Sequence, residues 1–166
     1  MTQKHPFYYL FVSLVIVILD QVSKYIVRLF MPVNDSIPVL GEFFCLTHVQ
    51  NPGAAFSLSL GSDGFNRVFF GSVAFIMIFV ILFMLKKSKS AWEKLSYSLI
   101  IGGAIGNLTD RIILGAVTDF LDFDFPDFIM NRWPVFNVAD SSIVVAVVLL
   151  LFYVLFIENR KSPEAK

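Results

Sequence analysis

Residues 102–111, Gly-Gly-Ala-Ile-Gly-Asn-Leu-Thr-Asp-Arg, place glycines and a group of polar side chains at the end of an apolar stretch. Gly102 and Gly106 are four residues apart, so on a helix they lie on the same face. A face of such small residues lets a second helix approach closely in lipid. The stretch therefore predicts a membrane helix that packs tightly against a neighbour.

The polar residues of this stretch indicate what the helix faces. Asn107 and Arg111 are four residues apart, and Asp110 lies on the adjoining face, so three polar side chains occur at one level. Such groups are costly in hydrocarbon and usually face a protein interior. We therefore expect a polar interior, in which these residues either form a scaffold or contact a substrate.

The composition of the whole chain also places it in a membrane. The 166 residues are 57% hydrophobic, with a mean hydropathy of +0.74 and 19 phenylalanines. One small soluble core could not bury this much apolar surface. The single cysteine, Cys45, excludes both an intrachain disulfide and a cluster of thiols for zinc.

Four apolar stretches are long enough to cross about 30 Å of hydrocarbon, which takes about 20 helical residues. They cover residues of about 7–30, 68–85, 95–114 and 138–157. The chain is thus predicted to be a single integral-membrane domain, residues 1–166, with an all-α core of four transmembrane helices.

The distribution of lysine and arginine predicts the orientation. The connector 86–94 holds four lysines, and the N-terminus and the tail of about 158–166 carry further basic residues. The connector 31–66 has no lysine or arginine, and 115–137 has one arginine. By the positive-inside rule, both termini and the 86–94 loop are cytoplasmic. The other two connectors then lie at the outer face.

The outer connector 31–66 is too long to be only a turn. Residues 37–40 and 42–49 are rich in β-branched and aromatic side chains, and Gly41 and Pro52 interrupt them. This pattern predicts a small extracytoplasmic β-sheet that rests on the membrane surface.

The acidic stretch 119–127 has a different interpretation. Its aspartates alternate with phenylalanines, and the spacing lacks the loop glycine and the terminal glutamate of an EF-hand. We expect an interfacial segment with its rings in the headgroup layer rather than a calcium site.

Asp119 and Asp140 are the strongest candidates for catalysis. Each lies at the edge of an apolar stretch, and the predicted orientation places both at the outer face. Two carboxylates at one depth can share a proton, as a pair that activates water must. His5 and His48 are isolated in the sequence, and no serine or cysteine has an evident basic partner. Metal and serine-nucleophile chemistry therefore lack their parts.

The predicted first helix carries three charged residues. Asp20 and Lys24 are four residues apart and can pair on one face. They either form an ion pair that locks this helix to its neighbours or take part directly in chemistry. Arg28 is near the predicted interface, where it can reach the headgroups and needs no special role.

These residues together resemble lipoprotein signal peptidase, also called signal peptidase II, a family of aspartic proteases. The resemblance covers nearly the whole chain, with five motifs in the family's order. They are Asp20-Gln21-Val22-Ser23-Lys24, Asn51-Pro52-Gly53-Ala54-Ala55-Phe56, the stretch 102–111, Val117-Thr118-Asp119-Phe120 and Phe136-Asn137-Val138-Ala139-Asp140-Ser141.

The resemblance implies four transmembrane helices, an extracytoplasmic β-cradle and a short interfacial helix, for which 119–132 or the region after Phe56 is the candidate. It implies a bacterial inner-membrane enzyme that removes signal peptides from prolipoproteins, cuts before the diacylglyceryl-modified cysteine of the lipobox, and is sensitive to globomycin. We expect no cofactor and no nucleic acid, with the chain acting as a monomer among membrane lipids.

The resemblance also implies residue roles. Asp119 and Asp140 match the catalytic pair, with one carboxylate activating water and the other, protonated, bonding the scissile carbonyl. The remaining matches fall into three groups. The substrate-binding group is Asn51, Gly53 and Arg111; the dyad-supporting group is Asn107 and Asn137; the structural group is Asp20, Lys24 and Asp110.

Two rival functions follow from the residues alone. A small ion or proton transport subunit would use intramembrane acids spread across the membrane, whereas here they lie towards the predicted outer half. A non-catalytic membrane scaffold would have no use for paired aspartates.

Within the pair, we expect Asp140 to be ionised more often, because the first turn of a helix favours negative charge.

Overall fold

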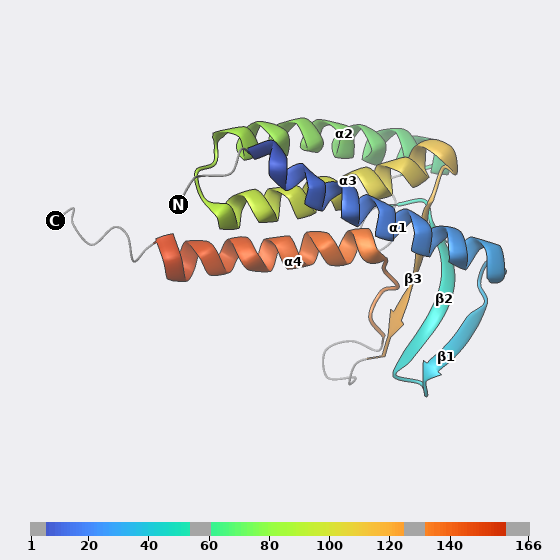
Figure 1. The fold of residues 1–166 in the computed structure, drawn as a ribbon. Coiled ribbons are helices and arrows are strands. Elements are labelled where there is room, and N and C mark those ends of the chain that lie inside the picture. Colours follow the sequence, from blue (N-terminus) through green and yellow to red (C-terminus); the bar gives the residue numbers. More distant parts are fainter. Residues whose placement is uncertain (1–5, 54–60, 125–131, 159–166) are drawn as a thin grey trace.

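The computed structural model describes residues 6–53, 61–124 and 132–158, and it shows a helical bundle with a small sheet at one end (Figure 1). Helices far apart in sequence lie side by side, and the sheet follows the ends of α1 and α3. The elements in chain order are η1 (Pro6–Tyr9), α1 (Leu10–Phe30), β1 (Ser36–Leu40), β2 (Phe44–Asn51), α2 (Asp63–Lys87), α3 (Ala91–Ile113), β3 (Val117–Phe123), α4 (Val138–Phe152) and η3 (Tyr153–Glu158).

Three helical segments are long and apolar enough to cross a membrane within the described ranges. They are Phe7–Phe30, Asp63–Lys87 and Val138–Glu158. Each coincides with a predicted span, and their exposed apolar side chains would face lipid. The predicted span 95–114 coincides with α3, which has 23 residues but carries the polar group described above.

The ends of α2 illustrate why these segments form helices. Ser62 caps its first turn by accepting a hydrogen bond from the Phe65 amide, and Asp63 follows in that turn. Its last turn holds Lys86 and Lys87. An acid at the N-terminus and bases at the C-terminus both interact favourably with the helix dipole.

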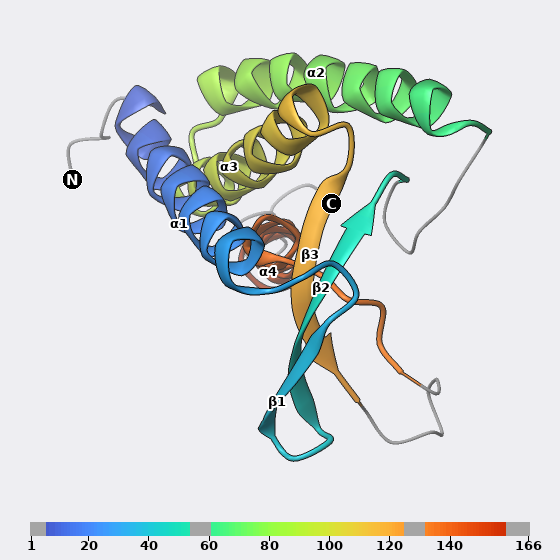
Figure 2. The same ribbon diagram turned by 90° about the vertical axis from the view of Figure 1, so that its right-hand side faces the viewer.

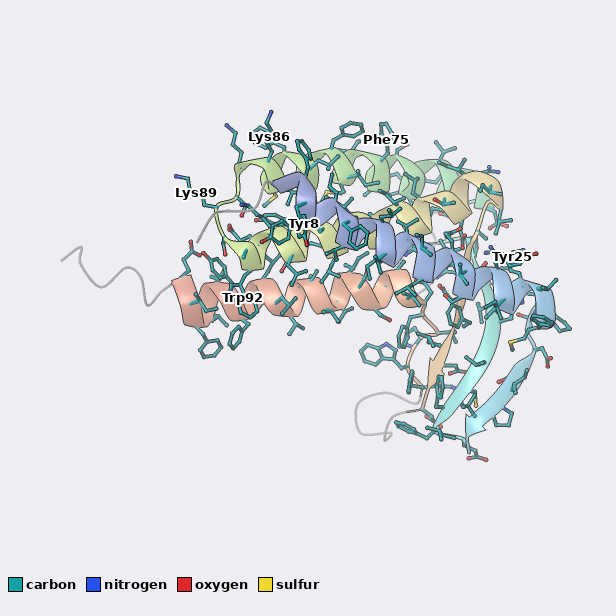
Figure 3. All side chains as sticks on the ribbon, viewed as in Figure 1. Tyr8, Tyr25, Phe75, Lys86, Lys89 and Trp92 are labelled. Atoms are coloured by element: carbon teal, nitrogen blue, oxygen red, sulfur yellow. The ribbon has the colours of Figure 1, made fainter. Side chains whose placement is uncertain are left out.

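Side chains of the two ends of the bundle differ in character. Figure 3 shows Lys86 and Lys89 at the end opposite the sheet, while Phe75 projects outward from the middle of α2. The basic end and the sheet end are therefore separated by the length of the helices.

The helix α3 contacts α1, α2 and α4 and forms the centre of the bundle. A Cβ atom at Gly102 would lie 2.8 Å from a side-chain carbon of α1, and one at Gly106 would lie 2.5 Å from the Asp20 carboxylate. The close approach predicted for these two glycines is confirmed. Gly103 has the same role towards α4, because its Cβ would lie 2.5 Å from the Ala139 carbonyl oxygen.

The sheet has three antiparallel strands in the order β1-β2-β3. Two strands come from the connector 31–66, as predicted, but the third comes from 117–123. Figure 2, in which α4 is seen end-on, shows the sheet extending away from the helices, with β1 farthest out.

The interpretation of 119–127 as an interfacial segment is therefore wrong for residues up to Phe123. Phe120 is buried against Val27 and Met31 of the α1 end, and the Phe123 ring stacks on Phe44. Asp119 and Asp122 are three residues apart, as are Phe120 and Phe123, so the pattern lacks the two-residue period of a strand. The segment forms a strand because β2 offers an edge that satisfies its backbone. The two segments proposed for a short interfacial helix otherwise include residues 54–60 and 125–131, outside the described residues.

Candidate active site

The side chain of Asn137 joins the two candidate aspartates. Asn137 caps the N-terminus of α4, where its Oδ1 accepts a hydrogen bond from the Asp140 amide at 2.9 Å, and its own amide donates to Asp140 Oδ2 at 3.3 Å. The same Asn137 donates from Nδ2 to Asp119 Oδ1 at 2.6 Å. One capping residue thus fixes the carboxylate from β3 beside the carboxylate from α4.

Asp119 lies opposite Val49 in the β2–β3 ladder, with only 3% of its surface exposed. Asn51, at the end of β2, donates from Nδ2 to Asp119 Oδ2 at 3.0 Å. Burial raises the pKa of Asp119 to about 7, and the negative charge of Asp140 adds to the rise, while the bonds from Asn51 and Asn137 oppose it. The carboxyl group can therefore hold a proton close to neutral pH.

Asp140 is bound from its other side by Asn107 of α3. Asn107 donates from Nδ2 to Asp140 Oδ1 at 2.8 Å. Its Oδ1 accepts from Lys24 Nζ at 2.8 Å and from Asn137 Nδ2 at 3.1 Å. Asn107 therefore links the buried ammonium group to Asp140 and holds the orientation of Asn137.

Lys24 is fully buried between two acids that position the backbone of the site. Its Nζ lies 2.9 Å from Asp20 Oδ2 and 3.4 Å from Asp110 Oδ2. Asp20 Oδ1 accepts from the Ala139 amide at 2.9 Å, and Asp110 Oδ2 accepts from the Thr118 amide at 2.9 Å. Each acid therefore holds the residue that directly precedes a candidate catalytic aspartate. This geometry favours the structural interpretation of the ion pair.

Arg111 reaches the turn that follows β2. Its Nη2 donates to the Gly53 carbonyl oxygen at 2.7 Å, and its Nη1 donates to the Asn107 carbonyl oxygen at 3.3 Å. Gly53 in turn donates its amide to Asn51 Oδ1 at 2.9 Å. Arg111 Nε is buried with no partner among the described residues. The cation thus holds the 51–53 turn next to Asp119.

Arg28 has a role that the sequence interpretation missed. Instead of reaching the headgroups, its Nη1 donates to Thr118 Oγ1 at 3.0 Å and lies 3.4 Å from Asp110 Oδ1. The missed signal is periodic, because Asp20, Lys24 and Arg28 recur every four residues and so share a face of α1. That face ties α1 to α4 through Asp20, to α3 through Lys24 and to β3 through Arg28.

The acids of the stretch once considered for calcium make protein contacts. Asp122 accepts from Arg132 Nε at 2.6 Å and from Thr47 Oγ1 at 2.5 Å. Across residues 6–53, 61–124 and 132–158, no group of three or more histidine, cysteine or acidic side chains could hold a metal ion. Asp127 lies outside the described residues.

The chain is similar over nearly its whole length to lipoprotein signal peptidases. The family model for signal peptidase (SPase) II matches residues 12–156. A lipoprotein signal peptidase of Desulforapulum autotrophicum is 40% identical over 156 residues, covering 92% of this chain and 93% of the relative. One of Halothermothrix orenii is 43% identical over 143 residues, covering 86% and 91%. A bacterial membrane enzyme solved at 2.3 Å resolution by the in meso method is 29% identical, with a TM-score of 0.81 and coverage of 96% and 93%.

Proposed function

This chain belongs to the signal peptidase II family, and on that premise we propose that it removes signal peptides from prolipoproteins. The cut falls before the lipobox cysteine that carries diacylglycerol. The observation that supports this activity most directly is the pair of carboxylates held by Asn137, of which Asp119 is buried and Asp140 is partly buried. The transport interpretation of the same acids gains no support, since the matched relatives are named as peptidases.

In the proposed mechanism, the two aspartates divide the acid and base roles. Asp140, in the first turn of α4 and bound by Asn107, is the ionised partner and takes a proton from water. Asp119, whose raised pKa of about 7 favours the protonated form, gives its proton to the scissile carbonyl oxygen. The water oxygen bonds to the carbonyl carbon, and no covalent enzyme intermediate forms.

Collapse of the tetrahedral intermediate completes the reaction. The C–N bond breaks, the proton held by Asp140 passes to the leaving nitrogen, and the intermediate's hydroxyl proton returns to Asp119. Both carboxyl groups are then in their starting states, so the cycle needs no cofactor.

The contacts of Arg111 support a role in holding the substrate backbone. The guanidinium organises the 51–53 turn, and Asn51 reaches from that turn to Asp119. In the proposed complex, an extended lipobox lies against this turn, with Arg111 and Asn51 as hydrogen-bond donors to its carbonyl groups. Asn107 and Asn137 instead support the dyad, as their bonds to the carboxylates indicate.

The site also suggests how the chain lies in the membrane. We include α3 as a fourth transmembrane helix, because the 23 residues of α3 are packed within the bundle of the three apolar helices. Lys86 and Lys89 lie at the end opposite the sheet (Figure 3), which favours cytoplasmic termini and a site near the outer face of the bacterial inner membrane. The short interfacial helix and the monomeric state remain predictions from the family resemblance.

A cleavage assay tests the proposed function. Purified wild-type protein in detergent should shorten a diacylglyceryl-modified prolipoprotein and leave the unmodified precursor uncut. Asp119→Asn and Asp140→Asn should abolish cleavage, while Asp124→Asn, at a side chain that is 35% exposed, should retain it. Globomycin should inhibit the wild type. Intact substrate with wild-type protein, or full activity of either dyad variant, contradicts the proposal.

A further inference from the structure

A groove of about 530 Å³ lies between the sheet-side halves of α2 and α3. The two helices contact each other, and Figure 2 shows α3 running obliquely to α2. The lining is mostly apolar, with a guanidinium group contributed by each helix. The α2 residues are Arg67, Val68, Gly71, Ser72, Phe75 and Ile76, and the α3 residues are Leu108, Arg111 and Ile112.

The length of the groove fits an acyl chain within one leaflet better than a signal-peptide helix that crosses the whole membrane. From Arg67 to Ile76 the α2 axis advances about 14 Å. That length is about half of the ~30 Å hydrocarbon core, the depth of one leaflet.

Gly71 widens the middle of the groove. A Cβ atom there would lie 3.9 Å from Leu108 Cδ1, in ordinary contact across the space between the helices. The absence of a side chain therefore leaves room that any larger residue would occupy.

The polar end of the groove is next to the candidate active site. Arg111 belongs both to the lining and to the 51–53 turn beside Asp119. Arg67 donates from Nη2 to the Ile112 carbonyl oxygen at 2.5 Å and is otherwise exposed at the same end. A ligand with an apolar chain and a hydrogen-bond acceptor at its head matches this arrangement.

We propose that the groove binds an acyl chain of the diacylglyceryl group on the substrate cysteine and that Arg67 donates a hydrogen bond to the ester carbonyl oxygen. This inference rests on the proposed function. Arg111 lines the groove and also bonds the turn beside Asp119, so an acyl chain in the groove holds the lipidated cysteine near the aspartates. Substrate without the acyl chain would lack this contact and would not bind productively.

A substitution that fills the groove tests the position of the chain. Gly71→Leu is compared with Val73→Leu, at an exposed α2 residue that does not line the groove. Each is assayed on prolipoproteins with long or short acyl chains. Gly71→Leu should raise KM for the long-chain substrate by about tenfold or more, because several methylenes lose their burial. It should change KM for the short-chain substrate less than about twofold, and Val73→Leu should change neither.

The outcomes separate the two proposals. If wild type cleaves neither substrate, the proposed function fails. If wild type cleaves both but Gly71→Leu leaves KM unchanged, the groove holds only bulk lipid and this inference is overturned. An equal rise in KM for long and short chains also overturns it, because the groove would then bind the signal-peptide helix.

The role of Arg67 needs a readout that its bond to α3 would not affect. Arg67→Ala should raise KM for the diester substrate by about tenfold, with kcat unchanged. On a dialkylglyceryl substrate, in which ethers replace the ester carbonyls, wild type and Arg67→Ala should have equal KM. A loss of the same size on both substrates shows that Arg67 acts only on α3 and overturns this assignment.

Discussion

Replacing Asp119 by asparagine should remove the contribution of this residue to the pH dependence of stability. Burial raises the pKa of Asp119 from 3.8 to about 7. A carboxyl group with a raised folded-state pKa costs no stability below about pH 4. The cost then grows with pH and is complete above pH 7. Linkage between the two pKa values gives about 2 kcal/mol at pH 5 and about 4 kcal/mol at pH 8.

The substitution adds a cost of its own that does not depend on pH. Asn51 and Asn137 both donate amide hydrogens to the Asp119 carboxylate. An asparagine presents its oxygen to one of these donors and its NH2 group to the other. The unmade hydrogen bond costs about 1–3 kcal/mol of stability. The expected signature is therefore the dependence of stability on pH: between pH 5 and pH 8, wild type should lose roughly 2–3 kcal/mol relative to Asp119→Asn.

The measurement is the thermal midpoint, Tm, of the protein in detergent at several pH values. Unfolding is monitored through the intrinsic fluorescence of Trp92 and Trp133. For a chain of this size the difference corresponds to a relative shift in Tm of about 5–10 °C. Asp124→Asn, at a side chain that stays 35% exposed, should run parallel to wild type. Parallel curves for wild type and Asp119→Asn would refute the reasoning that burial holds a proton on this residue.

Three further predictions concern the packing and the polar network. Gly106→Ala places a Cβ atom 2.5 Å from the Asp20 carboxylate and should cost about 1–3 kcal/mol of unfolding free energy, whereas Gly71→Ala, with only a 3.9 Å contact, should be tolerated. Lys24→Met leaves two buried acids without their cation and should cost about 3–5 kcal/mol, seen as a lower Tm; an unchanged Tm would show that the ion pair is not structural. Asn137→Ala removes the bonds that hold both aspartates and should lower kcat about ten- to a hundredfold, with a smaller effect on KM; a change confined to KM would contradict its role in supporting the dyad.

Much of the bundle follows from local sequence patterns. Hydropathy marks the helices because each must bury its own backbone polar groups in lipid and therefore needs a long apolar stretch. The contacts of Gly102 and Gly106 follow from their spacing, since residues four apart share a helix face wherever that helix packs. Gly103 was not predicted, because it stands outside the four-residue spacing of Gly102 and Gly106 and faces α4.

The third strand shows where local patterns stop being sufficient. The pattern of residues 117–123 does not distinguish an interfacial segment from a strand, and only the free edge of β2 selects the strand. That pairing places Asp119 opposite Val49 and within reach of Asn51. The separation of the candidate catalytic residues in sequence therefore carried no information about their distance in space.

By itself, the sequence determined that this chain is a membrane protein with long apolar helices, close helix contacts at glycines and two exceptional aspartates. These properties depend on composition and on periods of a few residues. The tertiary structure decided that Asn137 holds both carboxylates and that Lys24 links the acids that position Ala139 and Thr118. Those contacts join α1, α3, β3 and α4, and they exist only because burial leaves each charged or amide group no partner except another part of the chain.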